Sequence, residues 1–258
     1  LRSRAGNFSF DEMREGIAFA KRHGAKVYVA ANMVTHEGNE AGAGEWFRTL
    51  RDIGIAAVIV SDPALIAIAA SEAPGLPIHL STQASATNYE TLEFWKKLGL
   101  ERVVLAREVS MAELAEIRKH TDVEIEAFVH GAMCISYSGR CVLSNYMSKR
   151  DANRGGCSQS CRWKYDLYDM PYGAERRSVQ GEIPEDFSMS AVDMSMIEHV
   201  PDLIENGVDS FKIEGRMKSI HYVSTVSNVY KRAVDAYLES PEAFEAIKPA
   251  LVDELWKV

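Results

Sequence analysis

Four cysteines are the residues of this sequence whose type and spacing indicate chemistry most directly. They lie at Cys134, Cys141, Cys157 and Cys161, and the rest of the 258-residue chain contains no other. Cysteines gathered this closely bind metal in reducing compartments, whereas secreted proteins use them for disulfides. The spacing C-x6-C-x15-C-x3-C lacks the paired C-x2-C knuckles of many structural zinc sites. Spacing alone leaves tetrahedral zinc, an iron–sulfur cluster and four unligated thiols open.

Basic residues surround these cysteines. Between residues 140 and 164 the one acidic side chain is Asp151, and the basic set comprises Arg140, Lys149, Arg150, Arg154, Arg162 and Lys164. The whole chain has a formal net charge of −8, opposite to the basic balance usual for nucleic-acid-binding domains. The local cluster predicts contacts with RNA phosphates, and a solvated basic loop is the alternative.

Short apolar runs alternate with helical patterns along the chain. Helices are predicted at residues 9–23 and 110–120, each starting with a capping box, and seven strand candidates begin near residues 25, 56, 77, 101, 123, 187 and 210. Strands separated by helices indicate parallel crossover units. This number of units favours an α/β fold of the (β/α) TIM-like barrel type over an open doubly wound sheet.

A closed eight-stranded barrel needs more strands than this sequence supplies. The chain begins at Leu1 with a helix and ends inside a helical pattern, so we expect N-terminal strands and C-terminal segments of the full protein to lie outside it. The predicted organisation is one barrel-type domain at 1–258, with a cysteine-rich, locally basic insertion at 131–186. No membrane span or signal peptide is predicted, which favours the cytoplasm.

Polar side chains alternate with apolar ones in three predicted strands. Because successive side chains point to opposite faces, one face of these strands carries His79, Ser81 and Gln83; Glu124, Glu126, Phe128 and His130; and Lys212, Glu214 and Arg216. Barrel interiors are usually apolar, so polar inner faces indicate a lined cavity. The alternative is an internal salt-bridge network in which Lys212 and Glu214 neutralise each other.

The segment EAFVHGAMCISYSGRCVLS, from Glu126 to Ser144, resembles the signature of peptidase family U32, the collagenase-like proteins. The blocks HLSTQASATN, RVVLARE and FKIEGRMKS also resemble this family, so the resemblance covers essentially the whole chain. The best-fitting branch is that of the tRNA hydroxylation proteins. The family's first strands carry PAGN-like and YLGG-like motifs that are absent here, which implies that the candidate at 187–194 lies outside the ring.

The resemblance implies a function and a set of roles. It implies formation of 5-hydroxyuridine at the wobble position of tRNA, using prephenate and a [4Fe–4S] cluster on the four cysteines, with zinc as the alternative metal. Candidate proton carriers are His79, Glu126, His130 and Glu214. Prephenate is a dicarboxylate, so the candidate substrate ligands are Arg107, Lys212 and Arg216, together with Asn32 and Gln83. The implied partners are tRNA, prephenate and an electron donor or a paralogous family subunit.

The family name also raises a peptidase as an alternative function. The sequence has no G-x-S-x-G elbow, and HEGNE at 36–40 lacks the second histidine of a zinc protease motif. A cysteine nucleophile with His130 as its base would be unavailable if all four thiols hold a cluster. A non-catalytic iron–sulfur or RNA-binding subunit is the remaining alternative.

Overall fold

The computed structural model describes residues 7–169, 177–178, 187–190 and 192–258. Helices and strands alternate through its first half as α1 (Phe10–Arg22), β1 (Tyr28–Ala31), α2 (Ala43–Ile53), β2 (Ala57–Val60), α3 (Pro63–Glu72), β3 (Ile78–Leu80), α4 (Tyr89–Lys97), β4 (Arg102–Val104), α5 (Met111–His120) and β5 (Glu124–Gly131). The later elements of the fold are β8 (Met194–Ser195), α7 (Val200–Glu205), β9 (Ser210–Ile213), α8 (Ile220–Glu239) and α9 (Pro241–Leu255).

Local sequence signals fix where several helices begin. Ser9 accepts a hydrogen bond from the backbone of Glu12, whose carboxylate accepts from Ser9 in return, and Ser110 and Glu113 repeat this box at α5. Asp62 caps α3, with Pro63 in the first turn. Both predicted capping boxes are therefore confirmed.

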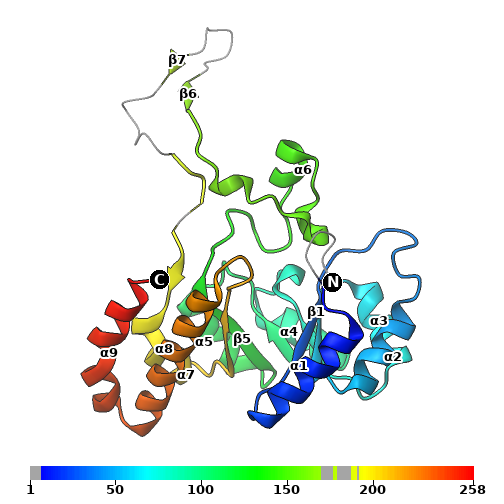
Figure 1. The fold of residues 1–258 in the computed structure, drawn as a ribbon, viewed down its shortest axis with the longest axis horizontal. Coiled ribbons are helices and arrows are strands. Elements are labelled where there is room, and N and C mark those ends of the chain that lie inside the picture. Colours follow the sequence, from blue (N-terminus) through cyan, green and yellow to red (C-terminus); the bar gives the residue numbers. More distant parts are fainter. Residues whose placement is uncertain (1–6, 170–176, 179–186, 191) are drawn as a thin grey trace.

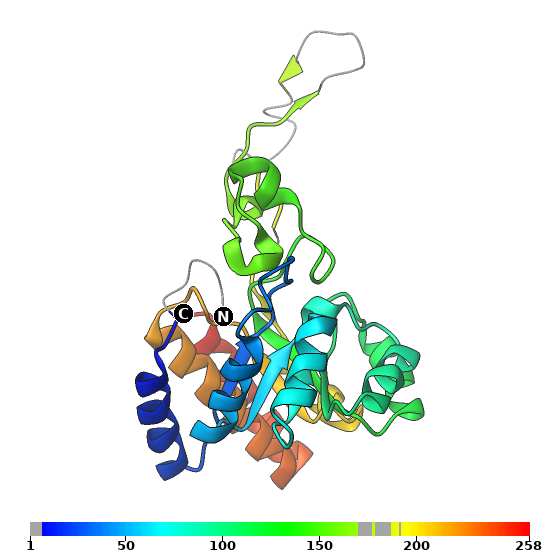
Figure 2. The same ribbon diagram turned by 90° about the vertical axis from the view of Figure 1, so that its right-hand side faces the viewer.

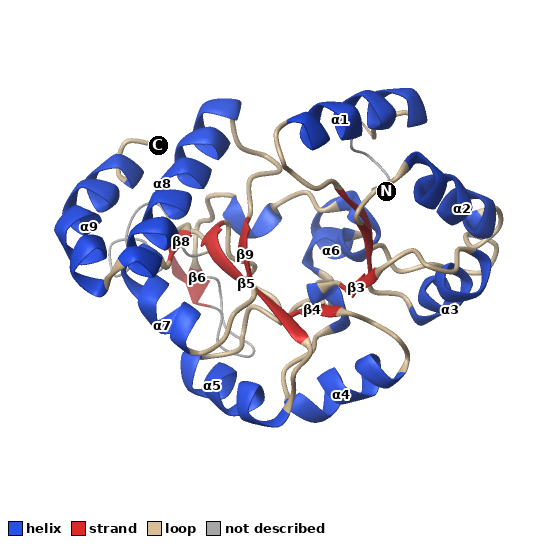
Figure 3. Cartoon of the chain, turned by 90° about the horizontal axis from the view of Figure 1, so that it is seen from below, coloured by secondary structure: helices blue, strands red, loops and turns tan. Residues whose placement is uncertain are grey.

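Six parallel strands form a curled sheet in the order β1-β2-β3-β4-β5-β9. Seen along the strands, the sheet is a curved wall, and helices cover its outer side (Figure 3). The α/β fold with a curled parallel sheet is confirmed. Within the described part of the chain, no pairing joins β9 to β1, so these strands form an open arc.

The strand predicted at 187–194 does not join this parallel sheet. Phe187 forms an isolated bridge with Tyr165, and β8 pairs antiparallel with His130 and Gly131 of β5. This pairing follows from the length of β5, whose pairing with β4 extends only as far as Glu126. The segment therefore adds no parallel strand, although its last residue, Met194, joins β5 as part of a short antiparallel strand of the same sheet.

The segment that carries the cysteines stands over the carboxyl ends of the strands (Figures 1 and 2). It contains α6 (Leu143–Ser148), the turns Ala152–Gly156 and Ser160–Arg162, and the short antiparallel pair β6 (Tyr168–Asp169) and β7 (Arg177–Ser178). Residues 170–176 and 179–186 of the predicted insertion lie outside the described residues.

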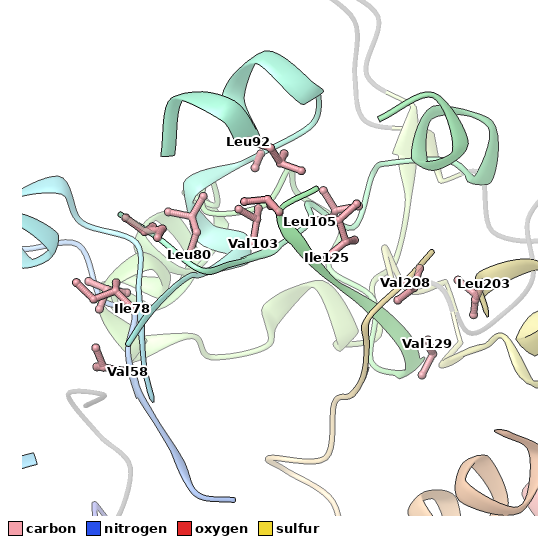
Figure 4. Close-up of a cluster of buried hydrophobic side chains, with 14 of the residues drawn as sticks. Val58, Ile78, Leu80, Leu92, Val103, Leu105, Ile125, Val129, Leu203 and Val208 are labelled. Atoms are coloured by element: carbon pink, nitrogen blue, oxygen red, sulfur yellow. The ribbon is translucent and has the colours of Figure 1, made fainter. Parts of the chain in front are cut away.

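The hydrophobic core lies between the outer face of the sheet and the helices. Val58, Leu80, Ile125 and Val129 of the strands and Leu92 of α4 are fully buried there (Figure 4). Burial of each such side chain contributes roughly 1.5–3 kcal/mol, which makes the sheet a rigid support for the residues at its end. None of the described helices has the length and hydropathy needed to cross a bilayer.

Candidate functional site

A cavity of about 430 Å³ lies where the cysteine segment meets the ends of the strands. The sequence-predicted residues that line it are Asn32, Gln83, Arg107, Cys134, Cys141, Cys157, Cys161, Arg162, Lys212, Glu214 and Arg216. Its volume lies in the usual range for small-molecule sites, and its position at the carboxyl ends of parallel strands is where barrel enzymes act. The fold therefore brings the four predicted metal ligands and all five predicted substrate ligands together.

The four thiols suit a metal centre by their chemistry. All four cysteines are free, and all four line this one cavity. Burial raises the pKa of the Cys161 thiol, and the nearby thiols of Cys134, Cys157 and Cys141 add to that rise, so the four groups interact electrostatically. Among the residues described, no three His, Cys, Asp or Glu side chains converge tightly enough for one metal ion. The described arrangement is therefore not that of a single-ion site, and it is the chemistry of four thiols in one cavity that fits a soft, multi-thiolate centre.

Hydrogen-bond donors surround the sulfur of Cys157. The backbone N–H of Gln159 donates to this sulfur at 3.4 Å, and the Ser144 hydroxyl donates to it at 3.9 Å. Ser144 also accepts from the backbone N–H of Ser158 at 3.1 Å, which fixes its hydroxyl. Such bonds stabilise a thiolate and tune a redox centre. Ser144 closes the family-like signature segment, but its contact with Cys157, 13 residues away, was not predicted from the sequence.

The loop between the first two cysteines is fastened to the sheet by Ser138. Its hydroxyl donates to Glu108 at 2.9 Å and accepts from the Arg107 backbone at 3.2 Å. Gly139 follows with φ of 71°, and a Cβ there would lie 2.1 Å from the Gln83 carbonyl oxygen, so only glycine fits. Cys134 and Cys141 are therefore held in a fixed place above β3 and β4.

Arg107 is the cation that the cavity leaves least compensated. Its guanidinium lies 3.7 Å above the centre of the Phe128 ring, and its Nε is buried without a hydrogen-bond partner among the described groups. Burial lowers the pKa of Arg107, against the raising influence of Cys134 and Glu214. A buried guanidinium with an unused donor favours a carboxylate ligand. Asn32 Oδ1 and Gln83 Oε1 are also buried without a partner.

Beneath the cavity the strands carry a buried charge network. Glu126 accepts a short hydrogen bond from Lys212, receives Arg102 at 3.4 Å and accepts from Ser210 at 3.2 Å. Burial alone would raise the pKa of Glu126, but the charge and hydrogen bond of Lys212 outweigh it and hold this pKa below its usual value. An internal salt-bridge network, the alternative considered for these strands, is thus present beneath the cavity, but the partner of Lys212 is Glu126 of the neighbouring strand and not Glu214. Glu126 itself does not line the cavity.

His79 also lies one layer below the cavity, since Ser81, two residues further along the chain and just past the end of β3, lines it. The imidazole is 4% exposed, stacks against Tyr28 with ring centres 5.4 Å apart, and leaves Nδ1 without a partner. Burial, followed by the charge of Arg102, lowers the pKa of His79 to about 4. This histidine is therefore neutral at neutral pH.

The depressed pKa of His79 predicts a pH-dependent stability. The unfolded chain binds a proton below about pH 6.5, whereas the folded chain resists it until about pH 4. The contribution of His79 is thus complete above pH 6.5 and is lost as the pH falls toward 4, at up to about 1.4 kcal/mol per pH unit. Urea unfolding across this range should show a flatter profile for His79→Gln than for the wild type. Parallel profiles would contradict the assignment.

His130 does not face the cavity. The pairing of β5 with β9 shifts register between Phe128 and His130, so a bulge interrupts the alternation and Val129 enters the core. Nδ1 of His130 lies 3.3 Å from the Tyr230 hydroxyl, and its ring packs against Tyr222 on α8. The predicted inner-face position of His130 is wrong for this reason. In the part of the chain that the structure describes, no histidine is hydrogen-bonded to a cysteine.

The basic residues of the cysteine segment occupy different positions. Arg140, Lys149 and Lys164 are exposed, and Arg150 is half-buried. Arg154 donates to Asn39 at 2.8 Å, and Arg162 pairs with Asp193 at 3.5 Å while it lines the cavity. Arg154 and Arg162 thus also fasten the segment to its neighbours, whereas Arg140 and Lys149 extend into solvent.

The sequence is similar to those of known tRNA hydroxylation proteins. The tRNA hydroxylation protein P1 of Bacillus subtilis (strain 168) is 51% identical over 257 residues, which cover 100% of this chain and 60% of that protein. The tRNA hydroxylation protein P of Escherichia coli (strain K12) is 36% identical over 275 residues, covering 91% of this chain and 61% of that protein. The chain therefore spans about 60% of the length of these relatives.

The name of a third relative refers to ribosomal RNA instead of tRNA. The 23S rRNA 5-hydroxycytidine C2501 synthase of Escherichia coli (strain K12) is 35% identical over 233 residues, covering 90% of this chain and 34% of that protein. The model described as "Peptidase family U32" matches residues 1–258. On the match of this whole sequence, the chain belongs to peptidase family U32.

Proposed function

We propose that the full protein is a tRNA-modifying hydroxylase that converts the wobble uridine to 5-hydroxyuridine in a prephenate-dependent reaction. The observation that carries this proposal is one cavity lined both by four free thiols and by a half-buried arginine whose buried Nε has no partner. The relatives support the choice of reaction, because two are called tRNA hydroxylation proteins and a third is an rRNA 5-hydroxycytidine synthase. Such an enzyme would act in the cytoplasm.

Cys134, Cys141, Cys157 and Cys161 would hold a [4Fe–4S] cluster. When bound, such a cluster supplies one-electron transfer, for which the protein needs an electron donor or a paralogous subunit as partner. The chain's own residues keep these thiols in place. Ser138 fastens the Cys134–Cys141 loop, and Ser144 with the Gln159 backbone donates to Cys157. Zinc on the same thiols is the alternative metal.

Arg107 would bind a carboxylate of prephenate. The Phe128 ring holds the guanidinium flat, so its donors present a preformed fork. Lys212 is less suited, because its charge is compensated by Glu126. Arg216, which is exposed at the edge of the cavity, is placed to meet the second carboxylate, and the unpartnered amide oxygens of Asn32 and Gln83 can accept from a hydroxyl.

Loss of Arg107 should weaken prephenate use specifically. A charge-assisted bidentate contact contributes about 1.5–3 kcal/mol, so Arg107→Gln should lower kcat/KM for prephenate by about 10- to 100-fold. Arg107→Lys should recover only part of this loss, because an ammonium lacks the planar fork. The measurement is 5-hydroxyuridine formation by the full-length protein at varied prephenate concentration, with iron content and tRNA affinity determined alongside.

Arg102→Gln serves as a comparison, since Arg102 is bonded to Glu124 and lies beneath the cavity rather than at its wall. It should lower stability without a selective change in the KM for prephenate. An Arg107→Gln enzyme with an unchanged KM and kcat would contradict the assigned role of Arg107.

A peptidase is less well supported by the described residues. A cysteine protease needs its thiol beside a histidine base, and His130 is turned toward Tyr230 of α8 instead. Cys134, the nearest cysteine in sequence, is exposed and shares the cavity with the other three thiols.

A further inference from the structure

Exposed apolar side chains concentrate in the cysteine segment. Six of the 19 exposed large hydrophobic residues in the described chain fall between residues 135 and 163, namely Ile135, Tyr137, Val142, Tyr146, Met147 and Trp163. The three aromatic rings stand out, since Tyr137 is 72%, Tyr146 87% and Trp163 43% exposed. Apolar groups gathered on one exposed segment mark an interaction surface rather than ordinary scatter.

One of these rings lines the cavity, and the other two are carried by neighbouring elements of the cysteine segment. Tyr137 lines the cavity itself, and its loop is held by the hydrogen bonds of Ser138, the next residue. Trp163 follows Arg162, another lining residue. Tyr146 lies on α6, which packs against the turn Ser160–Arg162 and stands above the sheet (Figure 1). The rings are therefore carried by elements that are packed together or hydrogen-bonded in place, and Tyr137 connects them to the cavity.

Cations accompany the rings on the same segment. Arg140 and Lys149 are exposed, and neither forms an ion pair with a described acidic residue. Such a combination suits a nucleic-acid strand, because its bases can stack on the aromatic rings and its negative phosphates can pair with the unpaired cations. A chain with a net charge of −8 gains little from general electrostatic attraction, so stacking has to supply much of the affinity.

We propose that Tyr137, Tyr146 and Trp163 are base-stacking residues that hold unpaired nucleotides of the RNA next to the modified base. This inference rests on the proposed function and adds the residues that would hold the unpaired loop around the wobble position. Bases inside an A-form helix are already stacked on each other, so protein rings cannot reach their faces. An unpaired loop exposes those faces and lets one base leave the stack and enter the cavity.

The test uses the full-length protein and two transcribed tRNAs. One has a normal anticodon loop with uridine at the wobble position, and the other has the loop sequence closed by pairing to an added complementary segment. Tyr137→Ala and Trp163→Ala should each raise Kd for the open-loop tRNA by about 5- to 10-fold, and Tyr137→Phe should leave it unchanged. Phe94→Ala, which removes an exposed ring on the outer helix α4, is the matched control.

The salt dependence of tRNA binding distinguishes the contribution of base stacking from that of charge. Arg140→Gln and Lys149→Gln should each reduce the slope of log K against log salt by about 0.7, whereas the ring variants should lower affinity with the slope unchanged. Ring variants that bind open-loop tRNA as tightly as wild type would overturn the inference and leave the surface to a protein partner. The inference would also be overturned if the ring substitutions raised Kd for the paired-loop tRNA as much as for the open-loop tRNA. A wild-type protein that binds neither tRNA would count against the proposed function itself.

Discussion

Replacing Cys157 by serine in the full-length protein is expected to abolish both bound iron and RNA hydroxylation. Four thiolates are needed to hold a four-iron cluster, and Cys157 also receives the hydrogen bonds from Ser144 and Gln159. Wild-type protein purified without oxygen should contain about four iron atoms and four sulfides per chain and absorb visible light. Metal and sulfide analysis, the visible spectrum and the amount of 5-hydroxyuridine measure the effect.

Val142→Ser is the matched control for this substitution. It places a serine beside Cys141 at a side chain that is 72% exposed, and it should leave the bound iron and sulfide unchanged. One zinc ion per wild-type chain, or full iron retention in Cys157→Ser, would overturn the cluster assignment.

Replacing Glu126 by glutamine is expected to produce a large loss of stability. The Glu126 side chain is 8% exposed and faces both Lys212 and Arg102, so its neutralisation leaves Lys212 without its partner and Arg102 with Glu124 alone. Breaking a buried ion pair in this way costs about 3–5 kcal/mol of unfolding free energy. Urea denaturation at pH 7 measures this change. As the pH falls through the lowered pKa of Glu126, the wild type should lose the same contribution.

Glu124 offers a close comparison, because it pairs with the same Arg102 but its side chain is 51% exposed. Glu124→Gln should cost no more than about 1 kcal/mol. The double variant Glu126→Gln with Lys212→Met should recover part of the loss, since the unpaired ammonium is then absent. Equal losses for Glu124→Gln and Glu126→Gln would contradict the buried network.

The sequence carried the signals for the fold because those signals are local. The boxes of Ser9 with Glu12 and Ser110 with Glu113 start their helices as expected. Apolar runs between helices give the six parallel strands. The gathering of cysteines between two strands was enough to predict that they share one site, since the carboxyl ends of parallel strands meet.

Other features depend on contacts between distant residues. The alternation rule assumes an uninterrupted pleat, and the bulge after Phe128 turns His130 toward α8. Likewise Lys212 and Glu214 share a strand face, yet Lys212 pairs with Glu126 across the sheet. The way neighbouring strands are aligned with each other determines both the direction of His130 and the partner of Lys212. This register cannot be deduced from a single sequence.

The hydroxyl contacts of Ser138 and Ser144 were also invisible in the sequence. Ser138 meets Glu108, which is 30 residues away, and Ser144 meets Cys157 at a separation of 13. Serines are common in loops, so their presence near cysteines alone predicts no partner. The structure identifies them because both are almost completely buried.

The most direct test of the central claim is the reaction itself. Full-length protein purified without oxygen is incubated with tRNA lacking the modification, prephenate and a reductant, and the nucleosides are analysed by mass spectrometry. The proposed function predicts 5-hydroxyuridine at the wobble position only when both prephenate and the iron-bearing protein are present. Protein that carries iron and binds tRNA but forms no 5-hydroxyuridine under these conditions would contradict it.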